Sequence, residues 1–145
     1  MTTSKTCRKC REVKSESEFY NSGYKTLAGK IIIGTLCKPC TKIYKKKRIV
    51  SIREWLHNYK KKIKCEKCGY SNKTHASFKT CAIEFHHAQG NKDFAIANSI
   101  RKGVSIERIK QEIKKCVALC SRCHAEIHSN ERHNLWAQGL RLTKI

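Results

Sequence analysis

The sequence is poor in acidic residues, and it has no long apolar run. Its 145 residues contain 11 aspartates and glutamates against 32 lysines and arginines, which gives a formal net charge of +21. Self-repulsion on this scale indicates a polyanionic partner, with nucleic acid as the first candidate and an anionic membrane surface as the second. No apolar run approaches the length of a membrane span, and the N-terminus lacks the apolar core of a signal peptide. We therefore expect an intracellular, cytoplasmic protein with no membrane partner.

Cysteine, in contrast, is abundant, and its spacing is regular. Eight of the ten cysteines form four C-x-x-C pairs, namely Cys7/Cys10, Cys37/Cys40, Cys65/Cys68 and Cys120/Cys123. A C-x-x-C turn presents two thiolates to one metal ion, whereas a disulfide framework gives no reason for this spacing. We therefore expect the pairs to bind zinc rather than to form disulfides. We expect the two remaining cysteines, Cys81 and Cys116, to be buried free thiols.

The first two pairs enclose a small module, residues 1–42, in which Cys7, Cys10, Cys37 and Cys40 would bind one structural zinc. Between the pairs, "EFYNSGYKTLAGKIIIGTLC" predicts two short strands with turns at Ser22-Gly23 and Ala28-Gly29. Proline contributes little to such turns, because Pro39 is the only one in the chain. The module is too small to bury a large core, so the metal would supply most of its folding energy.

A basic amphipathic helix is predicted over residues 43–64. Ile52, Trp55, Leu56, Tyr59 and Ile63 recur at helical spacing, and lysine and arginine fill the opposite face. That face is either merely solvated or bound to phosphate, and the net charge favours phosphate. The candidate contacts to a DNA backbone are Lys45, Lys46, Lys47, Arg48, Lys60, Lys61 and Lys62.

The remaining chain, from Cys65 onward, predicts short strands and helices around a second set of metal-ligand residues. "CAIEFHH" and "CVALC" predict strands, "AQGNKDFAIANSIRKG" predicts a loop, and "SIERIKQEIKKC" predicts a helix with Ser105 as its N-cap. A further helix follows "CVALC", and His124 and His128 share one of its faces at a spacing that metal ligands use. The tail, residues 131–145, holds Trp136, Leu140 and Leu142, and we expect it to dock on the core.

In this order, these motifs resemble the HNH endonuclease family, whose site is the ββα-metal fold. The resemblance covers about residues 65–130 and rests on Cys65-x-x-Cys68, on "EFHH" followed by "KDF", and on "CVALCSRCHAEIH". The N-terminal module is similar to a zinc-finger module in front of some phage-type HNH proteins. The resemblance implies a small zinc-stabilised α+β protein, with the nuclease unit preceded by a four-cysteine zinc module and a basic linker helix.

The resemblance also implies a role for each matching residue. His86, His124 and His128 would bind one catalytic divalent metal, Mg²⁺, Mn²⁺, Ni²⁺ or Zn²⁺, which would stabilise the phosphorane and the departing 3′ oxygen. His87 would be the general base that activates water. A second structural zinc would be bound by Cys65, Cys68, Cys120 and Cys123. The substrate would be double-stranded DNA in a bacterial or phage-infected cell, and cutting both strands would imply a homodimer.

Two further residues have roles that the sequence leaves open. Glu84 shares a strand face with His86, and it either orients that histidine or pairs with a lysine. Lys115 stands where the family carries a central asparagine, which holds the loop of the general base. Asn91 or Asn98 can substitute for that asparagine as the anchor of the loop.

The adjacent histidines pose a geometric problem, since neighbouring residues of a strand point to opposite faces. Both His86 and His87 would reach one site if the strand breaks just after Phe85, so regular strand geometry should end at or near His86. The alternative to an enzyme is a non-catalytic zinc-finger protein that only binds nucleic acid. The histidines count against it, because two zinc sites of four cysteines each do not need them. The excess of basic residues would suit RNA as well as DNA. The sequence shows no set of aromatic residues on which RNA bases would stack.

Overall fold

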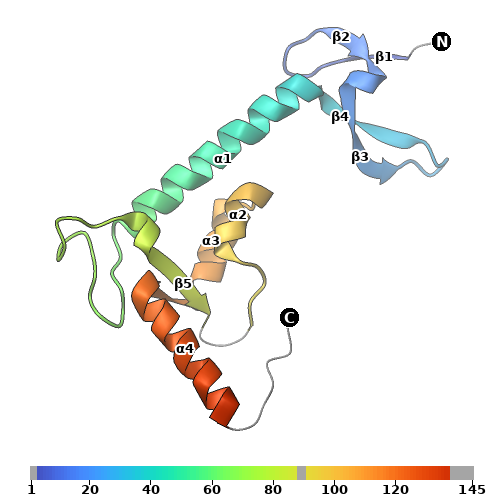
Figure 1. Ribbon diagram of the computed structural model, residues 1–145. Coiled ribbons are helices and arrows are strands. Elements are labelled where there is room, and N and C mark those ends of the chain that lie inside the picture. The colour runs from blue at the N-terminus through green and yellow to red at the C-terminus, as the bar shows by residue number, and fades with distance from the viewer. Residues whose placement is uncertain (1–2, 88–90, 138–145) are drawn as a thin grey trace. The chain divides into compact units, whose positions relative to one another are not determined.

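A computed structural model of the chain describes residues 3–87 and 91–137, with side chains described as far as residue 131. The chain divides into two compact units, Met1–Val50 and Ser51–Ile145. The boundary lies inside one long helix, α1 (Lys38–Lys60), so each unit contains a part of that helix (Figure 1). Among the described residues, no helix combines the length and apolarity needed to cross a membrane.

The first unit contains two small antiparallel sheets. β1 (Ser4–Thr6) pairs with β2 (Val13–Ser15), and, after a 3₁₀ turn, β3 (Phe19–Lys25) pairs with β4 (Ile31–Cys37). The β3–β4 hairpin confirms the two strands predicted between the first cysteine pairs. The turn predicted at Ser22-Gly23 is wrong, because this point is an irregularity inside β3, where the register with β4 shifts. The buried residues are Cys7, Phe19, Cys37 and Cys40.

Helix α1 begins five residues before the predicted start of the linker helix and ends at Lys60. Pro39 is its second residue, a position that proline tolerates because the first N–H groups of a helix have no partner within it. Lys61 and Lys62 follow in a turn. In the second unit Ile52 and Leu56 are buried, as the helical spacing predicted.

Two short helices pack with these residues. α2 (Ile96–Lys102) lies where the sequence predicted a loop, and it ends at Gly103, whose left-handed φ of 62° closes the helix. α3 (Ile106–Ile113) confirms the predicted helix, with the Ser105 side chain accepting a hydrogen bond from the Arg108 N–H. The two helices and α1 share one apolar cluster, whose buried members are Ile52, Leu56, Ile96, Ile109 and Ile113.

The second unit also holds the sheet that positions the site. β5 (Ile83–His87), which follows a 3₁₀ turn at Thr80–Ala82, pairs antiparallel with β6 (Cys116–Cys120). α4 (Ser121–Ala137) follows β6 directly and packs against both strands (Figure 1). The chain is thus a small α+β protein. The docking expected of Trp136, Leu140 and Leu142 concerns side chains outside the described part of the chain.

The strand break predicted just after Phe85 is wrong. β5 continues to pair regularly, with His86 opposite Val117 and His87 opposite Cys116. Because the ladder keeps the strand extended, alternation is preserved, and the two histidines point to opposite faces of the sheet.

The two leftover cysteines differ in their exposure. Cys81, which we expected to be buried, is exposed in the 3₁₀ turn before β5. Cys116 is partly buried, and its thiol donates to the Glu112 carbonyl oxygen at 3.3 Å.

Candidate functional site

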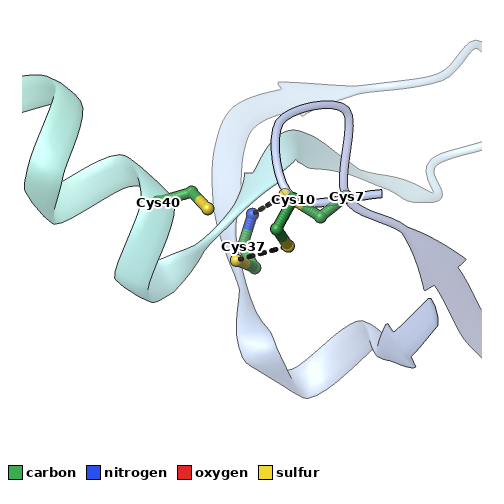
Figure 2. A group of neighbouring side chains, drawn as sticks. All are labelled: Cys7, Cys10, Cys37 and Cys40. Atoms are coloured by element: carbon green, nitrogen blue, oxygen red, sulfur yellow. Dashed lines mark hydrogen bonds between the residues drawn. The ribbon is translucent and has the colours of Figure 1, made fainter. Parts of the chain in front are cut away.

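The first cysteine cluster joins three segments of the N-terminal unit. Cys7 and Cys10 come from one turn, Cys37 ends β4, and Cys40 lies in the first turn of α1 (Figure 2). All four sulfur atoms lie within 4.8 Å of one another, and those of Cys10 and Cys37 are 4.0 Å apart. Tetrahedral zinc with bonds of about 2.3 Å to sulfur separates its ligands by about 3.8 Å. The cluster can therefore hold a structural zinc ion.

The second cluster has the same design in the other unit. Cys65 and Cys68 flank a turn, Cys120 ends β6, and Cys123 lies in the first turn of α4. The sulfur atoms of Cys68 and Cys120 are 3.7 Å apart. A zinc ion here would tie the turn to the junction between strand and helix, and so would fix where α4 begins.

The thiols in each cluster affect one another's ionisation. A backbone N–H from Cys37 lowers the pKa of the Cys7 thiol, whereas hydrogen bonding with Cys37 raises that of Cys40. In the second cluster burial would raise the pKa of Cys65, but nearby backbone N–H groups outweigh it, and the pKa of Cys123 is raised by burial and by its sulfur neighbours. Each cluster thus favours the ionisation of one thiol but opposes the ionisation of the next. A bound cation would stabilise the additional thiolates.

Three histidines form a third cluster of metal-ligand type. His86 comes from β5, and His124 and His128 come from successive turns of α4, with their ligand nitrogens within 4.8 Å of one another. His124 Nδ1 is hydrogen-bonded to Glu84, and His128 Nδ1 to Glu131 Oε2 at 2.9 Å. Because each Nδ1 is bonded to a carboxylate, the neutral form of either ring carries its lone pair on Nε2, the nitrogen that can bind a metal. Those two atoms face each other at 3.0 Å.

Two Nε2 atoms this close need either a shared proton or a metal ion between them. Two nitrogen ligands at right angles on a metal, each about 2.1 Å away, would be about 3.0 Å apart. The carboxylates behind the rings match the usual support of metal-binding histidines. Burial, followed by the neighbouring histidines, lowers the pKa of His86 and so favours its neutral, ligating form. Glu84 therefore orients a histidine, as one prediction held, but that histidine is His124 rather than His86.

His87 lies on the opposite face of the sheet in a separate network. Its Nε2 donates to Glu112 Oε1 at 2.7 Å, and the Glu112 side chain is only 1 % exposed. The same carboxylate oxygen accepts the backbone N–H groups of Asp93 and Phe94, while Lys115 Nζ lies 3.2 Å from the other oxygen. Burial would raise the pKa of Glu112, but these donors outweigh it and lower the pKa to about 2. Glu112 is thus a charged anchor at neutral pH.

Glu112 is the site residue that the sequence reasoning missed. A signal was present, because Glu112 lies on the apolar face of its helix, three residues after Ile109 and beside Ile113. Lys115 also binds residues 91–93, through Asp93 Oδ2 at 2.8 Å and the Asn91 carbonyl at 3.5 Å. Together, Glu112 and Lys115 hold residues 91–94, which precede α2.

A cavity of about 450 Å³ lies beside both histidine networks, because His87 and His124 each line it. Lys60 and Lys92 line it as well, and they give it positive charge suited to an anion. Burial lowers the pKa of Lys60, whose ammonium lies over the Phe85 ring at 5.6 Å. The other lining residues are Leu56, Cys81, Glu84, Phe85, Ala95, Ile96 and Ala97.

The other predicted DNA-backbone residues do not line this cavity. Lys61 and Lys62 are exposed just after α1. The remaining four are exposed on the part of α1 that belongs to the first unit, namely Lys45, Lys46, Lys47 and Arg48.

The two cysteine clusters predict the zinc content of the protein. Cys10→Ser and Cys68→Ser should each lose one of two tightly held zinc ions, since a three-sulfur cage is incomplete. Native mass spectrometry would count the ions, and cobalt absorbance would report thiolate ligation. Cys81→Ser is the matched control, because this exposed cysteine belongs to neither cluster, and it should keep both ions. Cobalt absorbance showing two intact four-thiolate sites in Cys10→Ser would contradict the assignment.

The carboxylate behind His124 predicts an effect on metal affinity. Glu84→Gln should weaken binding of Zn²⁺ or Ni²⁺ to the histidine cluster by roughly 10- to 100-fold, because a neutral amide supports the ring less well. Titration calorimetry with the cysteine clusters already loaded would measure this. Glu126→Gln is the control, because Glu126 lies on α4, as His124 does, but pairs with Lys67 and Arg122 instead of a histidine. Equal affinity in both variants would exclude this role for Glu84.

Comparison with protein-family models, with curated proteins and with solved structures found no match to the chain. A function must therefore be argued from the chemistry of the clusters and the cavity themselves.

Proposed function

We propose that the protein is a metal-dependent endonuclease that hydrolyses phosphodiester bonds in DNA. The observation that carries the proposal is the cavity lined by both His124, from the three-histidine cluster, and His87, which a buried carboxylate holds. Hydrolysis of a phosphodiester needs charge neutralisation at phosphorus and a base for the attacking water. A metal bound by the histidine cluster would neutralise the charge, and His87 would serve as the base.

The charge of the cavity suits a phosphodiester rather than a neutral substrate. Two lysines, Lys60 and Lys92, line it against one carboxylate, Glu84, and the whole chain carries a formal charge of +21. A polyanion such as DNA would be attracted over a long range and held by contacts to its phosphates.

Three histidine ligands suit a catalytic metal because they leave coordination positions open for water and phosphate. When bound, the divalent metal supplies neutralisation of charge on the phosphate and the departing 3′ oxygen. His86, His124 and His128 would hold it, and the bonds of Glu84 and Glu131 to Nδ1 of His124 and His128 favour the tautomer that ligates through Nε2.

His87 is the proposed general base. Because its Nε2–H donates to Glu112, the lone pair of its ring is on Nδ1, which takes the proton from water. The Glu112 carboxylate then faces a charged imidazolium and stabilises it. Glu112 is a positioning residue, since it acts through the ring of His87 and not on the substrate.

A protein that only binds nucleic acid is the alternative that experiment must exclude. Plasmid DNA incubated with Mg²⁺, Mn²⁺, Ni²⁺ or Zn²⁺, each with a chelator control, separates the two functions. Relaxed or linear products that depend on metal support the endonuclease. Binding without any cleavage under every metal would favour the binder.

Replacing the proposed base should abolish cleavage selectively. His87→Ala should reduce the cleavage rate by roughly 10²- to 10⁴-fold, because a general base contributes about that much. Zinc content and DNA affinity should remain near those of the wild type. His75→Ala is the control, since His75 is an exposed histidine bonded to Thr74 away from the cluster. Cleavage by His87→Ala at the wild-type rate would refute the assignment.

The anchor of His87 should also matter to the rate. Glu112→Gln should slow cleavage by about 10²-fold or more, because a neutral amide cannot stabilise the imidazolium or fix the tautomer as well. Metal affinity should be retained, since Glu112 lies in the network on the opposite face of β5 from the histidine cluster.

Lys115→Gln provides the matched control, because it perturbs the same carboxylate and loop but leaves the bond between His87 and Glu112 in place. It should slow cleavage less than Glu112→Gln does. Equal losses in the two variants would mean that Glu112 acts only by holding the loop.

A further inference from the structure

Exposed apolar side chains are segregated in this protein. In the part of the chain whose side chains the structure describes, every large apolar residue that is exposed belongs to the first unit. These residues are Val13, Tyr20, Tyr24, Leu27, Ile31, Ile32, Ile43, Tyr44 and Val50. Five of the nine lie on the β3–β4 hairpin and its turn, and exposed apolar side chains gathered on one element indicate a surface that a partner covers.

The end of the β3–β4 hairpin carries the most exposed of them. Leu27 is fully exposed at the apex, and Tyr24 is 74 % exposed beside it. The turn that presents Leu27 is well defined, because the Thr26 N–H donates to the Lys30 carbonyl at 2.8 Å. The Gly29 N–H donates back to the Thr26 carbonyl at 2.9 Å. Leu27 is therefore held outward by a hydrogen-bonded turn.

The chain segment that carries Leu27 has basic residues but no acidic ones. Residues 19–53 contain nine lysines and arginines and no aspartate or glutamate. Lys25 and Lys30 flank the turn, and at the other end of the hairpin the ammonium groups of Lys38 and Lys45 lie 5.8 and 5.4 Å from the Tyr20 ring centre. The partner must therefore be a polyanion that also offers apolar contact.

Duplex DNA meets both requirements. Its phosphates match the lysines, and apolar side chains can enter the base stack from the minor groove and kink the duplex. We propose that the β3–β4 hairpin binds duplex DNA in the minor groove and that Leu27 enters between two base pairs. This inference rests on the DNA partner of the proposed function but not on hydrolysis.

Fluorescence of the base stack tests the proposal directly. The full-length protein, without added divalent metal, is titrated into short duplexes that carry 2-aminopurine at TA steps, which kink easily. Wild-type protein should raise the emission as bases unstack. Leu27→Ser should abolish that rise and weaken binding roughly tenfold, the loss expected from one buried leucine. Leu27→Met, which keeps an apolar wedge, should retain both effects.

Val13→Ser is the matched control, since Val13 is also exposed in the first unit but belongs to the β1–β2 sheet. It should behave as the wild type. Zinc content of each variant checks that the module is folded. The proposal is overturned if Leu27→Ser keeps both emission and affinity, or if Val13→Ser loses them equally. It is also overturned if the tip binds anionic lipid vesicles or a second copy of the chain in place of DNA.

Adding Mg²⁺, Mn²⁺, Ni²⁺ or Zn²⁺ to the same complexes afterwards separates this inference from the proposed nuclease activity. Duplex that is bound and unstacked, but not cut under any metal, would support the hairpin and refute hydrolysis. If Leu27→Ser cuts DNA as well as the wild type does, and neither protein unstacks bases, then insertion of Leu27 is refuted but hydrolysis is not.

Discussion

The antiparallel pairing of β5 with β6 is the constraint on which the candidate site depends. Because the ladder runs through His87, it sends His86 toward α4 and His87 toward Glu112 on α3. The same pairing brings Cys120, at the end of β6, to the second cysteine cluster, which fixes the start of α4. One short strand pair thus sets the position of the histidine cluster and of the proposed base. A shift of register by one residue would exchange the two faces and disrupt both.

Local spacing made much of this structure predictable. The C-x-x-C pairs indicated the cysteine clusters, and the i, i+4 spacing of His124 and His128 put both rings on one helix face. Ser105 marked the start of α3, and alternation marked β5. These features are encoded within a few residues of one another, so sequence alone can reveal them.

Features that depend on distant residues were not predictable. Glu112 is 25 residues from His87 in the sequence, and only the packing of α3 against the strand shows that the two meet. The strand break after Phe85 was inferred from the need to bring two histidines to one point, but the sheet keeps them on opposite faces. One cavity nevertheless has both His87 and His124 in its lining, although His86 does not line it. The exposure of Cys81 likewise depends on tertiary packing rather than on residue type.

The division of the histidines between the two faces can be tested most directly by long-range ¹⁵N–¹H NMR of their rings. Zn²⁺ is added to protein whose cysteine clusters are already loaded. We expect the ¹⁵N resonances of the His86, His124 and His128 rings to shift on binding, while His87 keeps its proton on Nε2 throughout. A spectrum in which His87 shifts as a ligand, or in which the other three do not respond together, would contradict it.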